Sequence, residues 1–178
     1  MKRWARPGET VEAESFMMTF GGKGANQAIT AGYLNSSGGT THMLGQVGQD
    51  RDGIMMLDVM GQYTRTEGII KIEDAPTGMA YIMLNEEDRE NEIIIVGGAN
   101  MKYPAANVYF LPVSWVTAIK DAHVVLLQRE VPEWVNIAVA ACARKAGAMT
   151  MLDMGGQDDP LSKELIALCD IISPNEVS

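Results

Sequence analysis

Apolar residues along this chain fall into short continuous runs that alternate with stretches in helical spacing. Short apolar runs are typical of buried strands, and apolar residues three and four apart are typical of helices that cover a sheet. The alternation predicts repeated strand–helix–strand units, and so an α/β fold with a mainly parallel sheet flanked by helices. The predicted strands are residues 41–47, 123–128, 149–152 and 171–172, and the predicted helices are residues 24–34, 53–63, 132–147 and 161–168.

A different pattern occupies the middle of the chain. Two runs rich in Ile, Met and Tyr, residues 79–84 and 92–96, enclose a polar stretch at residues 85–91. Two extended runs joined by a polar loop predict an antiparallel hairpin, although a loop of seven residues is long for one. Within a parallel α/β chain, we expect this hairpin to form a flap or a second small sheet, with its acidic tip in solvent.

Composition narrows the class of protein. The chain has 178 residues, 47% apolar and 21% charged, which is ordinary for one globular domain. Its net charge of −9 argues against a nucleic acid partner, because general phosphate binding needs clustered Lys and Arg.

The apolar runs are shorter than the roughly 18 to 20 residues that span a bilayer, and residues 1–7 lack the apolar part of a secretory signal. Cys142 and Cys169 lie in apolar stretches, so we expect buried thiols in a reduced, cytoplasmic protein without a membrane partner.

The clearest candidate for ligand chemistry is a glycine-rich stretch, Gly21-Gly22-Lys23-Gly24-Ala25-Asn26-Gln27. Glycines allow positive φ and close approach of a ligand, and the helix that follows directs its free N–H groups toward that ligand. Lys23 adds a charge, and Asn26 adds a donor and an acceptor that suit a polyhydroxylated ligand. These features predict an anion or polyol site at a helix start. A glycine turn that only begins the helix is the alternative.

Two common nucleotide-binding loops do not fit these residues. A Gly-x-x-x-x-Gly-Lys-Ser/Thr loop is excluded because Lys23 is followed by Gly24. A dinucleotide fingerprint is excluded since Gln27 holds the position of its third glycine, and no clear strand precedes the loop. The loop therefore suits a ligand site without matching either pattern.

Ordered blocks along the chain resemble the ribokinase family of sugar kinases, which includes fructokinases and adenosine kinases. Each block alone is short, but together they follow the family's order and cover nearly the whole chain. The blocks are Pro7-Gly8-Glu9-Thr10, Phe20 to Ala28, Gly45 to Asp50, Thr77-Gly78, Gly98-Ala99-Asn100, Gln128 to Pro132 and Ser173 to Glu176. The resemblance implies a ribokinase-like fold in one partial domain, residues 1–178, with a small antiparallel β lid at about residues 8–20 and 77–98.

The resemblance also implies roles for single residues. A pentose would be lined, through backbone amides and the Asn26 amide, by Gly21, Gly22, Lys23, Gly24, Ala25 and Asn26. Glu130 follows a predicted parallel strand and would accept hydrogen bonds from sugar hydroxyls; a carboxylate that only begins the next helix is the alternative. Asn175 would lie near the ATP phosphates and the metal, or serve as a turn residue after Pro174.

The activity implied for an intact parent is ATP-dependent phosphorylation of ribose at its 5-hydroxyl. Mg²⁺ would accompany ATP, a K⁺-type ion would support an anion hole, and the lid would pair two subunits into a homodimer. Three other functions stay open: a non-catalytic sugar-binding or regulatory protein, a kinase for another sugar or nucleoside, and an interaction module without a ligand.

The chain departs from the family pattern at several positions. Only residues 1–6 precede the Pro7 block, where the family has a strand with a sugar-contacting Asp. Ser178 stands where the family's Asn-x-x-Glu motif has its Glu, and Asp153-Met154-Gly155-Gly156 replaces the more usual Asn-Pro-Ala-Pro. The family's Gly-Ala-Gly-Asp anion hole, its catalytic Asp and most of its ATP pocket have no counterpart. We therefore expect a chain truncated at both ends, with no catalytic residue or metal ligand assigned to it and no useful turnover alone.

Overall fold

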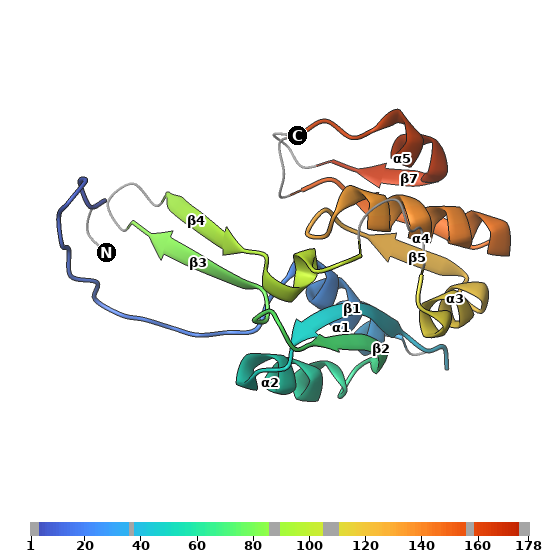
Figure 1. Cartoon of the computed structure of the whole chain (residues 1–178), viewed down its shortest axis with the longest axis horizontal. Helices are drawn as coiled ribbons and strands as arrows, with labels where there is room; N and C mark the ends of the chain where they lie inside the picture. Colours follow the sequence, from blue (N-terminus) through green and yellow to red (C-terminus); the bar gives the residue numbers. More distant parts are fainter. Residues whose placement is uncertain (1–3, 36–37, 86–89, 105–110, 156–158, 175–178) are drawn as a thin grey trace.

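The computed structural model describes residues 4–35, 38–85, 90–104, 111–155 and 159–174. Its elements form an α/β body from which one hairpin projects (Figure 1). In the body, β1 (His42–Gly48) pairs in parallel with β2 (Arg65–Ile72). A second parallel sheet has the order β5 (Val124–Leu127), β6 (Met149–Asp153), β7 (Ile171–Ser173). The predicted α/β class with parallel pairing is confirmed.

The helices that the residue pattern predicts are present with small shifts at their ends. They are α1 (Lys23–Leu34), α2 (Arg51–Met60), α4 (Glu133–Ala146) and α5 (Lys163–Leu168). Helix α4 ends at Gly147, whose φ of 78° is a left-handed conformation that glycine adopts at low cost. Of these helices and the others in the described residues, none combines the length and the apolar character needed to cross a membrane.

Three elements of the structure are absent from the sequence-based prediction. They are β2, the helix α3 (Val113–Lys120) and the short 3-10 helix η1 (Gly98–Met101). Strand β2 interleaves Arg, Thr, Glu and Lys with its Gly and Ile residues, and among the described strands it pairs with β1 alone. A partly exposed edge strand tolerates charged side chains, so it lacks the continuous apolar run by which the other parallel strands are recognised.

The main core lies between β5–β6 and the helices α3, α4 and α5. Its buried side chains are Trp115, Ile119, Val125, Leu127, Val135, Val139, Ala140, Ala143, Ala148, Leu152 and Leu165. The Trp115 indole N–H donates to the Gly68 carbonyl 2.7 Å away and so ties α3 to β2. Tyr103 packs edge-on against both Trp115 and Trp134, and burial raises the pKa of the Tyr103 hydroxyl. This core joins the two parallel sheets into one body.

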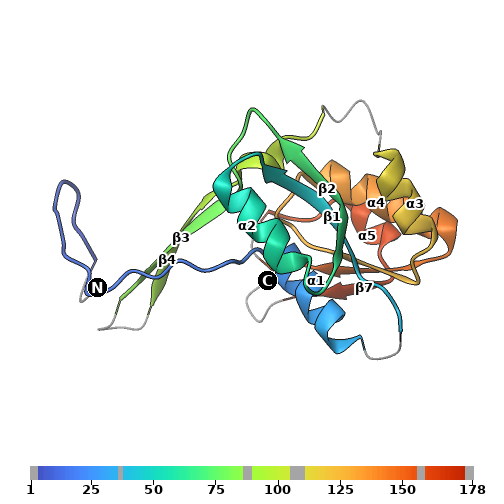
Figure 2. The ribbon, with the colours of Figure 1, turned by 90° about the horizontal axis from the view of Figure 1, so that it is seen from below.

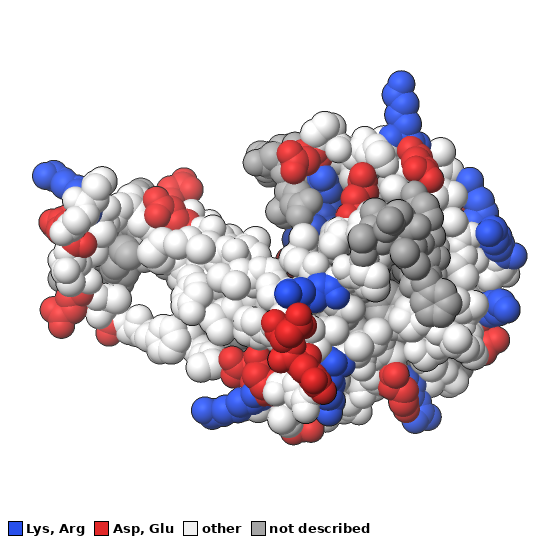
Figure 3. Space-filling model, in the orientation of Figure 1, with Lys and Arg blue, Asp and Glu red and all other residues white. Residues whose placement is uncertain are grey.

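The projecting hairpin is made of β3 (Met79–Leu84) and β4 (Asn91–Val96), paired antiparallel as the sequence predicts. It points away from the body in two perpendicular views, as does the extended segment before α1 (Figure 2). Eight of its large apolar side chains are between 41% and 62% exposed, and its middle carries no charge in the space-filling view (Figure 3). Residues 8–20, the other expected part of a lid, contain no strand.

Candidate functional site

The glycine loop turns into helix α1 at Gly22. Gly22 is the N-cap, with φ of 93° and ψ of 131°, a conformation in which a side chain would be strained. The first helical hydrogen bond runs from the Asn26 N–H to the Gly22 carbonyl, 2.9 Å away. Because the first N–H groups of a helix have no partner within it, those before Asn26 are directed out of the helix start. The predicted ligand-binding loop is therefore formed as a helix N-terminus.

Glu130 reaches this helix start from far along the chain. Its Oε2 accepts a hydrogen bond from the Lys23 backbone N–H, 2.8 Å away and 107 residues distant in sequence. Glu130 follows β5, so it lies at the carboxyl end of a parallel strand, where ligands of open α/β sheets bind. The structure thus brings together the two parts of the predicted site, with Glu130 half-buried and the Gly21–Gly22 backbone exposed.

A second glycine lets α1 approach this strand end closely. A Cβ at Gly24 would collide with the Gln128 side-chain amide and would lie 3.3 Å from the Met43 methyl carbon. The Gln128 carbonyl in turn accepts a hydrogen bond from the buried Asn136 amide of α4, at 2.9 Å. Gly24 therefore serves packing within the site, and the chain between β5 and α4 is held from both sides.

Gln27 and Asp153, to which the sequence analysis assigns no role in the site, also lie beside it. The Gln27 side-chain amide of α1 donates to Asp153 Oδ2 at 3.3 Å, and Asp153 Oδ1 accepts from the Gly155 N–H at 2.8 Å. Asp153 is the last residue of β6 and is paired in register with Ser173 of β7. Its place at the carboxyl end of a predicted parallel strand is the signal that could have identified it.

The remaining predicted residues occupy different environments. Asn26 is exposed on the first turn of α1, while Lys23 is half-buried and Ala25 is buried in the core. Asn175 lies outside the described residues. Among the residues that the structure describes, no group of three or more His, Cys, Asp or Glu side chains is arranged to hold a metal ion.

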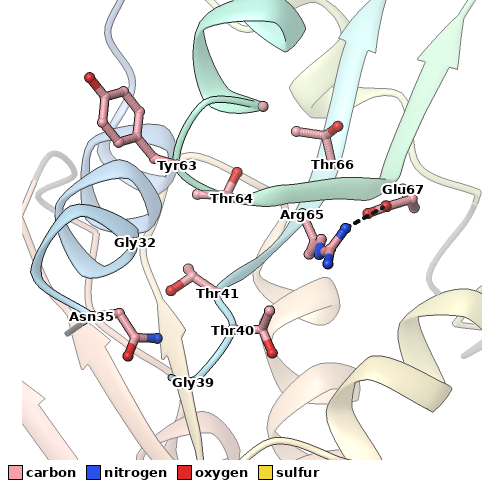
Figure 4. Close-up of a pocket in the computed structure, with 11 residues that line it drawn as sticks. Gly32, Asn35, Gly39, Thr40, Thr41, Tyr63, Thr64, Arg65, Thr66 and Glu67 are labelled. Atoms are coloured by element: carbon pink, nitrogen blue, oxygen red, sulfur yellow. Dashed lines mark ion pairs between the residues drawn. The ribbon is translucent and has the colours of Figure 1, made fainter. Parts of the chain in front are cut away.

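Two hollows in the described part of the body lie away from the glycine loop. One, of about 320 Å³, lies where α1 ends and where β1 and β2 begin (Figure 4). Its rim includes the Arg65–Glu67 ion pair, whose atoms are 4.0 Å apart. This hollow is at the amino ends of the parallel strands, opposite the edge that carries Glu130. At that carboxyl edge, the Gly21–Gly22 backbone is exposed and Glu130 is half-buried.

Comparison with known proteins assigns the family. A model of the pfkB family of carbohydrate kinases matches residues 2–177. The chain belongs to this family. The ribokinase of Arabidopsis thaliana is 38% identical over 179 residues, which cover 99% of this chain and 45% of the relative. The ribokinase of Staphylococcus aureus (strain COL) is 36% identical, over 99% of this chain and 56% of the relative. The chain thus spans about half the length of these pfkB-family relatives.

Solved structures confirm the ribokinase-like fold. The ribokinase of Arabidopsis thaliana, complexed with ribose and ATP, matches with a TM-score of 0.86 and 38% identity, over 99% of this chain and 55% of that one. The ribokinase of Thermotoga maritima matches with a TM-score of 0.80 and 26% identity, over 99% and 54% of the two chains. As a pfkB-family member, this chain has the fold that its ordered sequence blocks predict.

Proposed function

We propose that this chain forms the sugar-binding part of a kinase that phosphorylates ribose with ATP. The observation that carries the proposal is the hydrogen bond between Glu130 and the Lys23 N–H, which joins an acceptor carboxylate to a helix start with outward N–H groups. A pentose needs both kinds of partner, because each of its hydroxyl groups donates one hydrogen bond and accepts others. Support for ribose comes from the ribokinase relatives and from the Arabidopsis thaliana structure with ribose and ATP.

The residues of this chain would orient the sugar. The Gly21–Gly22 backbone is exposed and would let a ring approach closely, while the exposed Asn26 on the first turn of α1 would offer an amide donor and acceptor. Glu130 would accept from sugar hydroxyls while its Oε2 stays fixed by the Lys23 N–H. Charge-assisted hydrogen bonds of this kind are about twice as strong as neutral ones, so Glu130 would dominate sugar affinity.

The nucleotide side of the site rests on the family resemblance. We propose that Asn175 contacts the ATP phosphates; in the sequence it follows Ser173, the register partner of Asp153, by two residues. Carboxylate oxygens are ligands that Mg²⁺ accepts, so Asp153 would be the described residue to hold an ion that accompanies the phosphates. The K⁺-type ion and the catalytic base would be held by the part of the relatives that this chain does not match.

The exposed hairpin supports a further part of this proposal. Lid and dimer contact are two roles that bury apolar surface, and both strands of the hairpin present apolar side chains on both faces. An apolar patch of this kind is unusual on a monomer surface and indicates a partner surface. We propose that the hairpin closes over bound sugar and pairs two subunits.

Titration calorimetry tests the proposed function directly. Ribose is added to the 178-residue chain with and without ATP, alongside other pentoses, hexoses and nucleosides. We expect heat of binding for ribose. Binding of a nucleoside in its place would indicate a different kinase substrate, and absence of binding to any of these ligands would contradict a sugar site.

Turnover is expected to depend on the rest of the kinase. Phosphoryl transfer relies on positioning and on electrostatic stabilisation of the moving group. Loss of one oxyanion-hole donor alone typically costs about 3 to 4 kcal/mol in comparable enzymes. We therefore expect the 178-residue chain to bind ribose without ribose-dependent ADP formation. A rate above background in a coupled assay would contradict this expectation.

A further inference from the structure

The two arms of the β3–β4 hairpin leave the body at one place. Residues 75–78 lead into β3, and the helix η1 follows β4 directly (Figure 1). The Ala99 N–H of η1 donates to the Pro76 carbonyl, 2.8 Å away. Gly98 has φ of 52°, and the Pro76 carbonyl occupies the space that a side chain at Gly98 would need. The two arms are therefore tied together, and whatever holds residues 75–78 holds the whole hairpin.

Asp50 contacts Thr77 in residues 75–78, which are called the root of the hairpin below. Asp50 Oδ1 accepts from the Thr77 hydroxyl at 2.6 Å, and Asp50 Oδ2 accepts from the Thr77 backbone N–H at 2.7 Å. The Thr77 hydroxyl also accepts from the Gly48 N–H at the end of β1, 3.0 Å away. One carboxylate and one hydroxyl thus connect the beginning of the hairpin to the end of the parallel strand β1.

Helix capping alone does not require this arrangement. Asp50 is the N-cap of α2 and accepts from the Gly53 N–H through Oδ1, at 2.8 Å. A single side-chain oxygen satisfies an N-cap, and Asn caps about as well as Asp. The second oxygen, Oδ2, is directed at Thr77 instead. The Thr77 contacts therefore give the carboxylate a role beyond the helix that it begins.

Glycines on both sides make room for this contact. A Cβ at Gly48 would lie 2.5 Å from the Thr77 nitrogen and 2.8 Å from Asp50 Oδ2. A Cβ at Gly53 would lie 2.8 Å from the Thr77 hydroxyl oxygen. Real Cβ atoms do not approach other atoms so closely, so a side chain at either position would push the Thr77 segment away from the end of β1.

We propose that Asp50 is a positioning residue for the hairpin. Through Thr77, it would hold the hairpin in one orientation relative to the body, from which the hairpin closes on bound sugar. This inference rests on the proposed function, because it assigns the hairpin the role of a lid. If this contact were lost, the hairpin would sample more orientations in the free chain. Closure on the sugar would then cost more conformational entropy, so sugar affinity would fall. Asp50 itself need not touch the sugar.

Two variants separate positioning from capping. Asp50→Asn keeps an N-cap oxygen for Gly53 but places an amide N–H₂ group against the Thr77 N–H. Thr77→Val keeps the shape of the side chain and removes the hydroxyl that joins Asp50 to Gly48. Asp52→Asn is the matched control, since it removes a carboxylate from the first turn of α2 without touching Thr77. Thr77→Ser restores the hydroxyl and is the rescue variant.

Two measurements on the 178-residue chain test the positioning role of Asp50. Hydrogen exchange of β3 and β4 should accelerate about tenfold in Asp50→Asn and Thr77→Val, the change expected for one lost hydrogen bond to a charged group, with α4 and β5 unaffected. Ribose affinity by calorimetry should fall by a similar factor of about ten. Asp52→Asn and Thr77→Ser should match the unsubstituted chain in both.

The outcomes distinguish this inference from the proposed function. Unchanged hairpin exchange in both test variants overturns the positioning role. Faster hairpin exchange with unchanged ribose affinity overturns the link to sugar closure. Acceleration that extends equally to α4 and β5 shows a general loss of stability and also overturns the inference. If the unsubstituted chain binds no sugar, the proposed function fails, and hairpin exchange alone then decides whether Asp50 holds the root.

Discussion

The carboxylate of Glu130 accepts a hydrogen bond from the Lys23 backbone N–H at 2.8 Å, although 107 residues separate the two. This contact places an acceptor from the end of β5 against the start of α1. The hydrogen bond also offsets the free-energy cost of partly burying the Glu130 carboxylate, since an unpaired buried charge is unfavourable. Two segments far apart in the sequence thereby meet in the candidate site of this pfkB-family chain.

Replacement of Glu130 tests this site. Glu130→Gln keeps the size of the side chain and removes its charge, so we expect ribose affinity to fall by about tenfold or more, the loss typical of a hydrogen bond to a charged group. Calorimetry measures the change. Glu164→Gln on α5 is the matched control and should bind ribose like the unsubstituted chain. Equal affinity in the two variants would remove Glu130 from the site.

The backbone at Gly22 gives a prediction about stability. Gly22→Ala places a side chain at φ of 93°, which is strained even though its Cβ would be 3.7 Å from Glu130 Oε2, an ordinary contact distance. We expect the free energy of unfolding to fall by about 1 to 2 kcal/mol. Gly21→Ala meets no atom within 4 Å and should change stability little. Urea unfolding compares the two, and equal stability would show that the loop relaxes freely.

Asp50 predicts a pH dependence of stability. The hydroxyl of Thr77, followed by its backbone N–H, lowers the pKa of Asp50 below its ordinary value of 3.8. Because the folded-state pKa is the lower one, this stabilisation is complete above the unfolded-state pKa and is lost as pH falls through the folded-state pKa. Urea unfolding from about pH 6 to about pH 3 should show a smaller acid loss in Asp50→Asn than in Asp52→Asn. Parallel curves for the two variants would contradict this.

The exposed hairpin predicts self-association. Ile95 on β4 is 62% exposed and lies opposite Ala80 of β3. We expect the 178-residue chain to run larger than a monomer in size-exclusion chromatography with light scattering. Ile95→Lys should shift it toward the monomer, because a charge opposes burial of this surface. Thr117→Lys, an exposed position on α3, is the control. A monomer at every concentration would rule out pairing through the hairpin.

Much of the fold follows from local sequence. Continuous apolar runs predict β5 and β6, because buried parallel strands are apolar on both faces. Apolar spacing, with Pro132 before α4 and Gly147 after it, predicts that helix and its ends. The charged edge strand β2 was not predicted, because it is a strand through its pairing with β1 and its own residues show no continuous apolar run.

The helix start at the glycine loop, the hairpin and the family are all predictable from the residues alone, because glycine conformation, apolar runs and ordered motifs are local properties of the chain. Three contacts become visible in the folded chain and not before: Glu130 with Lys23, Gln27 with Asp153, and Asp50 with Thr77. Each of these contacts joins segments at least 27 residues apart. They form because packing of helices on parallel strands brings strand ends and helix starts to one edge, and no local pattern states which ends will meet.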